Sequence, residues 1–189
     1  SFFGKGKIPD LQAELNRFPT SDISPEKIKI LYTLGREELR MNNLEVGISH
    51  LNEALTNASE GSFESNKLRN IWINRIRYSL GVGYLRLGET ENCCQKYNAD
   101  SCIVPIQGDG IHTNRRGSLK AIQCFSELLD QEIADEDIME TLRIRLAARW
   151  LLNIAYMTLG NFPEGIPERH RIADTYFKSP IPFPKFRNI

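Results

Sequence analysis

The sequence lacks the features that mark nucleic-acid-binding, membrane-spanning or disordered proteins. Its 189 residues carry 24 basic and 24 acidic side chains, so no excess of positive charge favours nucleic acid or an anionic membrane as partner. No run of apolar residues approaches the roughly 18 that a membrane span needs. With 41% hydrophobic and 25% charged residues, the composition is that of a folded globular protein of one or two domains.

The chain also lacks an initiating methionine and an apolar signal core, because it begins with Ser1-Phe2-Phe3. We therefore expect either that a leader has been removed or that the chain is a fragment. Strand-like alternation of apolar and polar residues is absent as well, and nearly all of the patterned sequence has helical periodicity.

Helix boundaries are well marked. Ser24 followed by Pro25 and Glu26 is a typical helix start, with a capping serine, a proline in the first turn and an acid near the positive end of the helix dipole. Asn42, Gly88 and Gly160 are expected to end helices. The predicted helices cover residues 9–18, 24–41, 44–55, 66–87, 118–131 and 136–159.

A short pattern recurs along these helices. Leu80-Gly81 is followed by Tyr84 and a turn at Gly88, and Leu152-Asn153 is followed by Tyr156 and a turn at Gly160; Leu34-Gly35 begins a weaker copy. The helices between these copies carry small and large residues at matching slots, namely Gly47, Leu51 and Ala54, then Ala121, Phe125 and Leu128. Small residues at such slots let paired helices approach closely.

This pattern resembles the tetratricopeptide repeat, a helical hairpin of about 34 residues, over residues 28–166. The resemblance implies an all-α, tetratricopeptide-like α-solenoid of about three helical hairpins. The expected organisation is an N-terminal arm with a short helix at 1–23, the repeat domain at 24–166, and an extended Pro-rich tail at 167–189. An ordinary antiparallel helical bundle is the alternative.

The second hairpin carries a long insert. Five residues lead from Gly160 to Gly165, whereas 33 lead from Gly88 to Ala121, so about 28 extra residues occupy the insert at 89–117. It contains three of the four cysteines, Cys93, Cys94 and Cys102. Reduced thiols, or a disulfide from Cys93 or Cys94 to Cys102 in an oxidising compartment, are both consistent with this spacing; a zinc site lacks its usual paired ligands.

The insert has a second resemblance, carried by Ser101-Cys102-Ile103-Val104-Pro105-Ile106, by Gly110-Ile111-His112-Thr113 and by the helix that ends at Gly160. Over residues 80–189 the chain is similar to the repeat region that precedes the FG-GAP propeller in secreted bacterial proteins of the ASPIC/UnbV type. The resemblance implies a secreted, periplasmic or cell-surface protein. It also implies Cys93 as the partner of Cys102 in a disulfide that staples the insert. The chain contains no propeller, so no propeller function is carried over.

Catalytic chemistry has few candidate residues. His50 and His170 are expected at the surface, which leaves His112, in the insert near Asp109 and the cysteines. His112 could bond loop backbone groups, bind a metal, or act as a base beside a thiol. Gly108-Asp109-Gly110 is a tight turn and not a phosphate-binding loop. We therefore expect no enzymatic activity and no cofactor.

The functional hypothesis concerns the concave face that the first helix of each tetratricopeptide hairpin lines. Its outward positions are Lys29, Tyr32, Arg36, Arg40, Arg75, Tyr78, Arg86 and Trp150. Arginine and aromatic side chains bind extended acidic peptides or glycans through forked hydrogen bonds and stacking, although a solvated charged face would look the same. The hypothesis is a non-enzymatic, exported scaffold that holds a protein or peptide partner.

Two further functions stay open. The first is a self-assembling structural subunit of an extracellular oligomer or filament, docking through Ser1-Phe2-Phe3 and the Pro-rich tail. The second is a metal-binding or enzymatic site around His112.

Overall fold

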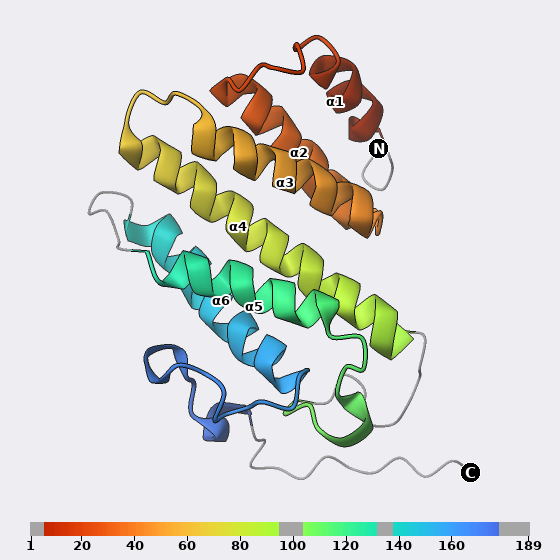
Figure 1. Ribbon diagram of the computed structural model, residues 1–189, viewed down its shortest axis with the longest axis vertical. Coiled ribbons are helices and arrows are strands. Elements are labelled where there is room, and N and C mark those ends of the chain that lie inside the picture. The colour runs from red at the N-terminus through yellow and green to blue at the C-terminus, as the bar shows by residue number, and fades with distance from the viewer. Residues whose placement is uncertain (1–5, 95–103, 132–137, 178–189) are drawn as a thin grey trace.

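The computed structural model describes residues 6–94, 104–131 and 138–177, and over these ranges it contains helices and loops but no strand (Figure 1). The α-helices are α1 (Lys7–Leu15), α2 (Pro25–Arg40), α3 (Leu44–Glu60), α4 (Asn66–Glu89), α5 (Arg116–Leu129) and α6 (Ile138–Met157). Short turns follow as η1 (Thr90–Cys94), η2 (Gly108–Gly110), η3 (Glu168–His170) and η4 (Asp174–Phe177). The prediction of an all-α fold is confirmed.

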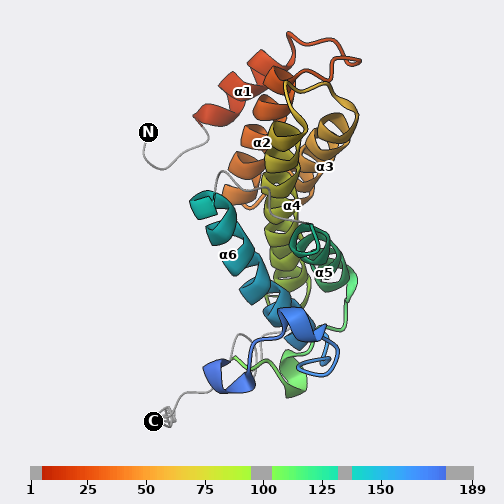
Figure 2. The ribbon, with the colours of Figure 1, turned by 90° about the vertical axis from the view of Figure 1, so that its left-hand side faces the viewer.

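Consecutive helices from α2 to α6 pack side by side, and α4 also contacts α2 and α6 directly. Seen along the edge, α2, α4 and α6 lie toward one side of the molecule and α3 and α5 toward the other, while α1 packs on α2 (Figure 2). Two groups of buried side chains fill the space between the layers. One joins α2, α3 and α4 around Leu31 and Leu51, and the other joins α4, α5 and α6 around Phe125 and Leu152.

The predicted helix signals act as expected at three ends. The Ser24 hydroxyl accepts a hydrogen bond from the Lys27 backbone N–H at 3.4 Å, and Pro25 opens α2. Asn42 and Gly160 adopt left-handed backbone conformations, with φ of 65° and 68°, in the turns after α2 and α6. These two residues therefore end the helices by reversing the backbone, as the sequence indicates.

Glycines set the distance between paired helices. A Cβ added at Gly35 would lie 2.7 Å from Leu51 of α3, and one added at Gly81 would lie 2.4 Å from the Phe125 ring of α5. Real Cβ contacts are longer than this, so each large side chain fills the space that a missing side chain leaves. The small and large slots read from the sequence are thus the contacts that hold α2 to α3 and α4 to α5.

Gly88 does not end its helix, although the sequence favours a stop there. The helix α4 runs on to Glu89 and passes into the π-helical turn η1, which ends at Cys94. The close approach here requires Gly117, because a Cβ added to Gly117 would lie 2.5 Å from the Gly88 nitrogen, whereas one added to Gly88 would lie 3.2 Å from His112 Nδ1. The two ends of the insert therefore meet backbone to backbone.

The third repeat unit also differs from the expected hairpins. The sequence predicts about three hairpins, whereas the described residues form two, α2–α3 and α4–α5, followed by the single helix α6. From Thr158 to Phe177 the chain contains turns and two short 3-10 segments, η3 and η4, in the place of a second α-helix. We call residues 166–177 the C-terminal segment.

Replacing Gly81 by alanine tests the glycine contact with Phe125. We expect Gly81→Ala to lower the free energy of unfolding by about 1–3 kcal/mol, because overpacking outweighs the gain in helix propensity. Adding Phe125→Leu should recover part of this loss in chemical denaturation. Gly83→Ala is the matched control on the same helix, since its Cβ would meet the nearest side-chain atoms at 3.2 Å, not at 2.4 Å. Equal stability of the two alanine variants would contradict the proposed contact.

Candidate functional site

A chain of contacts links the three helices of the α2–α4–α6 layer. The Arg36 guanidinium carbon lies 5.4 Å from the centre of the Tyr32 ring, and Tyr32 meets Trp72 edge to face at 5.5 Å between ring centres. The Arg75 guanidinium carbon lies 5.6 Å from the centre of the Trp72 ring, and Arg75 Nη2 donates to Glu140 Oε2 at 2.7 Å. We call these five residues the Arg–aromatic chain. It forms one continuous polar and aromatic surface.

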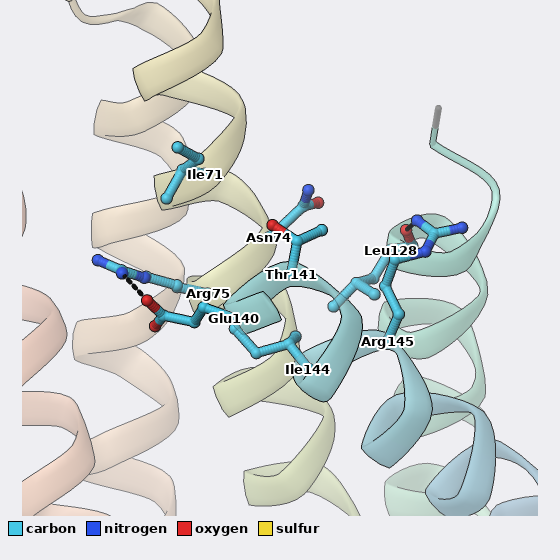
Figure 3. A pocket seen from close by; sticks show the side chains of 8 residues that line it. All are labelled: Ile71, Asn74, Arg75, Leu128, Glu140, Thr141, Ile144 and Arg145. Atoms are coloured by element: carbon cyan, nitrogen blue, oxygen red, sulfur yellow. Dashed lines mark hydrogen bonds and ion pairs between the residues drawn. The ribbon is translucent and has the colours of Figure 1, made fainter. Parts of the chain in front are cut away.

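The Arg75–Glu140 ion pair bridges α4 and α6, as Figure 3 shows. Beside it, Asn74, Thr141 and Ile144 help to line a cavity of about 10 Å³ between α4, α5 and α6. This volume suits a single water molecule, and the buried Asn74 Oδ1 has no hydrogen-bond partner among the described residues. The cavity is therefore a joint between helices and too small for a ligand.

An open hollow of about 690 Å³ lies on the same side of the helices. It is lined by Tyr78 of α4 and by Met139, Glu140, Arg143, Ile144 and Ala147 of α6. Large apolar side chains continue along α6 as an exposed stripe, namely Met139, Leu142, Leu146 and Trp150. Together the hollow and this α6 stripe offer apolar surface next to fixed positive charge, which is the composition of many peptide-binding grooves.

Four of the eight predicted groove residues come together in this way. Tyr32, Arg36 and Arg75 belong to the Arg–aromatic chain, and Tyr78 lines the hollow. Lys29 is exposed on α2 about two turns before Arg36, and it belongs neither to the Arg–aromatic chain nor to the lining of the hollow. The binding of a partner at these residues stays a prediction.

The other three predicted residues make structural contacts. Arg40 forms an ion pair with Glu37 at 2.8 Å. Arg86 donates to the Leu39 carbonyl oxygen at 2.6 Å, so its guanidinium satisfies the last turn of α2. Trp150 is 42% exposed and packs on Phe177 of the C-terminal segment, with 4.5 Å between ring centres. The groove hypothesis therefore loses Arg86 as an available cation.

Three residues of this face were not predicted from the sequence, Trp72, Glu140 and Arg143. Trp72 lies three residues before Arg75 and Arg143 three residues after Glu140. In both cases the spacing of nearly one helical turn places the pair on one side of the helix. That spacing was the available signal for both.

The C-terminal segment is attached to α6 through Asn153. This residue occupies the slot that Gly35 and Gly81 fill in the two hairpins, yet it faces extended backbone and not a helix. Its Nδ2 donates to the His170 carbonyl oxygen at 2.9 Å, and its Oδ1 accepts the Ile172 backbone N–H at 3.0 Å. Extended backbone leaves donors and acceptors unpaired, and the Asn153 amide satisfies one of each.

Charged groups strengthen this attachment. Arg149 Nη2 donates to the Arg171 carbonyl oxygen at 2.6 Å, and His170 Nε2 donates to Asp130 Oδ1 at 2.8 Å. The hydrogen bond from His170, with a further one from Arg169, holds the pKa of the Asp130 carboxyl below its ordinary value. The prediction that His170 is solvated was wrong, because only 7% of it is exposed once the segment folds back onto α5 and α6.

His112 lies at the junction of the insert with α5 and α6 and is 3% exposed. Its backbone N–H donates to the Thr158 carbonyl oxygen at 2.8 Å, while its ring contacts side chains. Nδ1 lies 2.9 Å from Ser118 Oγ, and Ser118 Oγ lies 2.8 Å from Thr158 Oγ1. Nε2 lies 3.5 Å from Cys93 Sγ. Burial lowers the pKa of His112, so the ring is neutral at pH 7. The ring thus bonds side chains and not the loop backbone.

The cysteines differ in environment. Cys94 is exposed, while Cys124 packs among core residues, where burial raises the pKa of its thiol to about 12. Cys102 lies outside the described residues, as do the Pro-rich end of the tail and Ser1-Phe2-Phe3. The Cys93–Cys102 disulfide therefore stays a prediction.

Over the described ranges, no group of three or more His, Cys, Asp or Glu side chains is placed to hold a metal ion. Within those same ranges, no helix combines the length and the apolar character that crossing a bilayer requires. Comparisons with known protein families, curated proteins and solved structures find no match to this chain.

The Asn153 amide can be tested directly. We expect Asn153→Leu, which keeps the size of the side chain but removes its hydrogen bonds, to lower stability by about 1–3 kcal/mol. Exchange of the Ile172 amide with deuterium should accelerate at least tenfold, while amides of α2 keep their protection. Asn161→Ala, at an exposed amide in the same loop, is the control. Unchanged exchange at Ile172 would contradict the role given to Asn153.

Proposed function

We propose that the chain is a non-enzymatic interaction scaffold that binds an extended acidic partner along the α2–α4–α6 face. Its helical hairpins, closed by glycine contacts and joined side by side, support a tetratricopeptide-like solenoid. In such an array the first helix of each unit lines the binding face. The face of this chain is then made by α2, α4 and α6.

The Arg–aromatic chain is the observation that carries this proposal. Arg36 and Arg75 are held in place by Tyr32 and Trp72, so little conformational entropy is lost when their guanidinium groups bind a carboxylate. Arg75 is already paired with Glu140, which indicates that this position accepts a carboxylate group. A partner carboxylate would take the place of Glu140 or share Arg75 with it.

The hollow beside Tyr78 defines the rest of the partner. Its apolar walls and the exposed α6 stripe suit large apolar side chains, while Arg143 at its edge adds a further cation. An extended peptide in which acidic and apolar residues alternate would present both kinds of group along one face. Acidic peptide is therefore favoured over glycan as the partner.

Self-association is the second candidate, and the α6 stripe favours it. Met139 is 72% exposed and Leu146 57% exposed, on the last helix of the array. A second copy packing there would bury this apolar surface, and an open-ended contact of this kind can propagate into a filament.

Export completes the proposal. It rests on the resemblance of the insert to the repeat region of secreted ASPIC/UnbV-type proteins and on the predicted link from Cys93 to Cys102. A secreted, periplasmic or cell-surface location would keep such a link oxidised.

The groove proposal predicts a charge-specific loss of binding. Against fluorescent peptides in which glutamate alternates with leucine or phenylalanine, Arg36→Ala with Arg75→Ala should weaken binding at least tenfold, or about 1.4 kcal/mol, with little change in melting temperature. The matched control is Arg115→Ala with Lys120→Ala, which removes two exposed cations from the region of α5.

Equal losses in the two double variants would indicate a general charge effect and contradict a groove site. Concentration-dependent elution in size-exclusion chromatography, abolished by Leu146→Glu, would favour self-association over peptide binding.

The disulfide prediction is tested by counting thiols. Of the four cysteines, two should react after denaturation without reductant, and all four after reduction. Mass spectrometry of the unreduced digest should join Cys93 to Cys102. Four reactive thiols in both conditions would refute the disulfide and remove this argument for export.

A further inference from the structure

The His112 junction brings together side chains from four separate segments. Cys93 comes from η1 after α4, His112 from the loop before α5, Ser118 from the first turns of α5, and Thr158 from the turn after α6. All except Cys93 are buried, and the contacts between them join the Thr158 hydroxyl to the Cys93 sulfur through Ser118 and the imidazole. The direction of each hydrogen bond in this series can be worked out from its most buried end, at Thr158.

That inner end is the carbonyl oxygen of Ala155, a residue with no exposed surface. The backbone N–H of Leu159, which would reach it in a continued helix, donates to the Tyr156 carbonyl oxygen instead. The Thr158 hydroxyl lies 2.8 Å from the Ala155 oxygen and donates to it. Thr158 Oγ1 is placed to donate either to Ala155 or to Ser118, but a hydroxyl has one proton. Because the carbonyl oxygen can only accept, we assign that proton to Ala155, and Thr158 then accepts from Ser118.

The direction of the remaining hydrogen bonds is then fixed. Ser118 uses its only proton on Thr158 and must accept from His112 Nδ1. In a neutral imidazole with its proton on Nδ1, Nε2 carries a lone pair. This lone pair faces the Cys93 sulfur at 3.5 Å, which is within the range of a hydrogen bond donated by a thiol.

We propose that Cys93 and His112 form a reactive thiol site that undergoes exchange with disulfide substrates. A nucleophile, an adjacent base and a third group that orients the base are the parts that thiol activation requires. Ser118 and Thr158 are positioning residues, because they act only through the imidazole. The site lies apart from the Arg–aromatic chain and does not depend on the proposed groove.

The exchange step balances without a further reagent. Cys93 gives its proton to His112 Nε2 as its sulfur attacks one sulfur of the substrate disulfide. The substrate S–S bond breaks, a mixed disulfide forms on Cys93, and the departing thiolate takes the proton from the imidazolium. The substrate disulfide is the oxidant, and the thiol of Cys93 is oxidised. The proposed Cys93–Cys102 disulfide and this thiol site exclude each other within one chain, because an oxidised Cys93 has no thiol to attack with; the site belongs to the reduced chain.

Neighbouring Cys94 provides an internal comparison, because the two cysteines are adjacent and differ in exposure. Cys94 is exposed and Cys93 is partly buried, so accessibility alone predicts that Cys94 reacts faster. Activation by His112 predicts the opposite order. Cys124 is partly buried, and burial raises the pKa of its thiol to about 12, so it contributes little in either case.

The experiment uses the full chain, reduced and desalted without oxygen, with the small neutral reagent 2-hydroxyethyl disulfide. One variant keeps only Cys93 and carries Cys94→Ser, Cys102→Ser and Cys124→Ala. The second variant keeps only Cys94 and carries Cys93→Ser, Cys102→Ser and Cys124→Ala. Mass spectrometry follows the mixed disulfide at pH 7. We expect Cys93 to react at least tenfold faster than Cys94, and His112→Gln to remove this advantage.

A second pair of variants separates activation from folding. Thr158→Val removes the hydroxyl that fixes the imidazole proton and should slow Cys93, while Thr158→Ser keeps the hydroxyl and should restore the rate. Circular dichroism checks that each variant is folded. The proposal is overturned if Cys94 reacts as fast as Cys93, or if the Cys93 rate is the same in folded Thr158→Val and Thr158→Ser.

Discussion

At Gly81 an added Cβ would lie 2.4 Å from the Phe125 ring, so α4 and α5 can pack as they do only because this position has no side chain. The same holds for Gly35 against Leu51 of α3. Each contact brings two helices close along their length, and the shared helix α4 then joins both hairpins into one array. The alignment of α2, α4 and α6, and with it the Arg–aromatic chain, depends on these approaches.

Close approach also organises the insert. Because Gly88 and Gly117 meet backbone to backbone, the residues that follow α4 and those that precede α5 are brought to one place. Cys93 and His112, separated by 19 residues in the chain, therefore lie within contact distance. Thr158, at the end of α6, completes the arrangement from the next unit. The close backbone contact between Gly88 and Gly117 thus brings the residues of the thiol site together.

In the third unit, the glycine contact that holds the two helices of a hairpin together is absent. Asn153 stands where the hairpins have glycine, and a side chain of this size excludes a closely packed helix. It offers a carboxamide instead, which bonds the backbone of the C-terminal segment at His170 and Ile172. The segment covers part of α6, but Leu142 and Leu146 stay exposed.

Helix boundaries and the small and large slots were predictable, because capping, turn chemistry and helical periodicity act within a few residues of the chain. The helix start at Ser24, the turn at Asn42 and the periodic slots that hold Gly81 and Phe125 follow from such local rules, whereas the contact between Gly81 and Phe125 is seen only in the packed helices. The availability of each arginine and the burial of each histidine were not predictable. Arg75 meets Glu140 across 65 residues, Arg86 meets Leu39 across 47, and His170 meets Asp130 across 40. Hydrogen bonds and burial depend on distances in space, which only the packed helices decide.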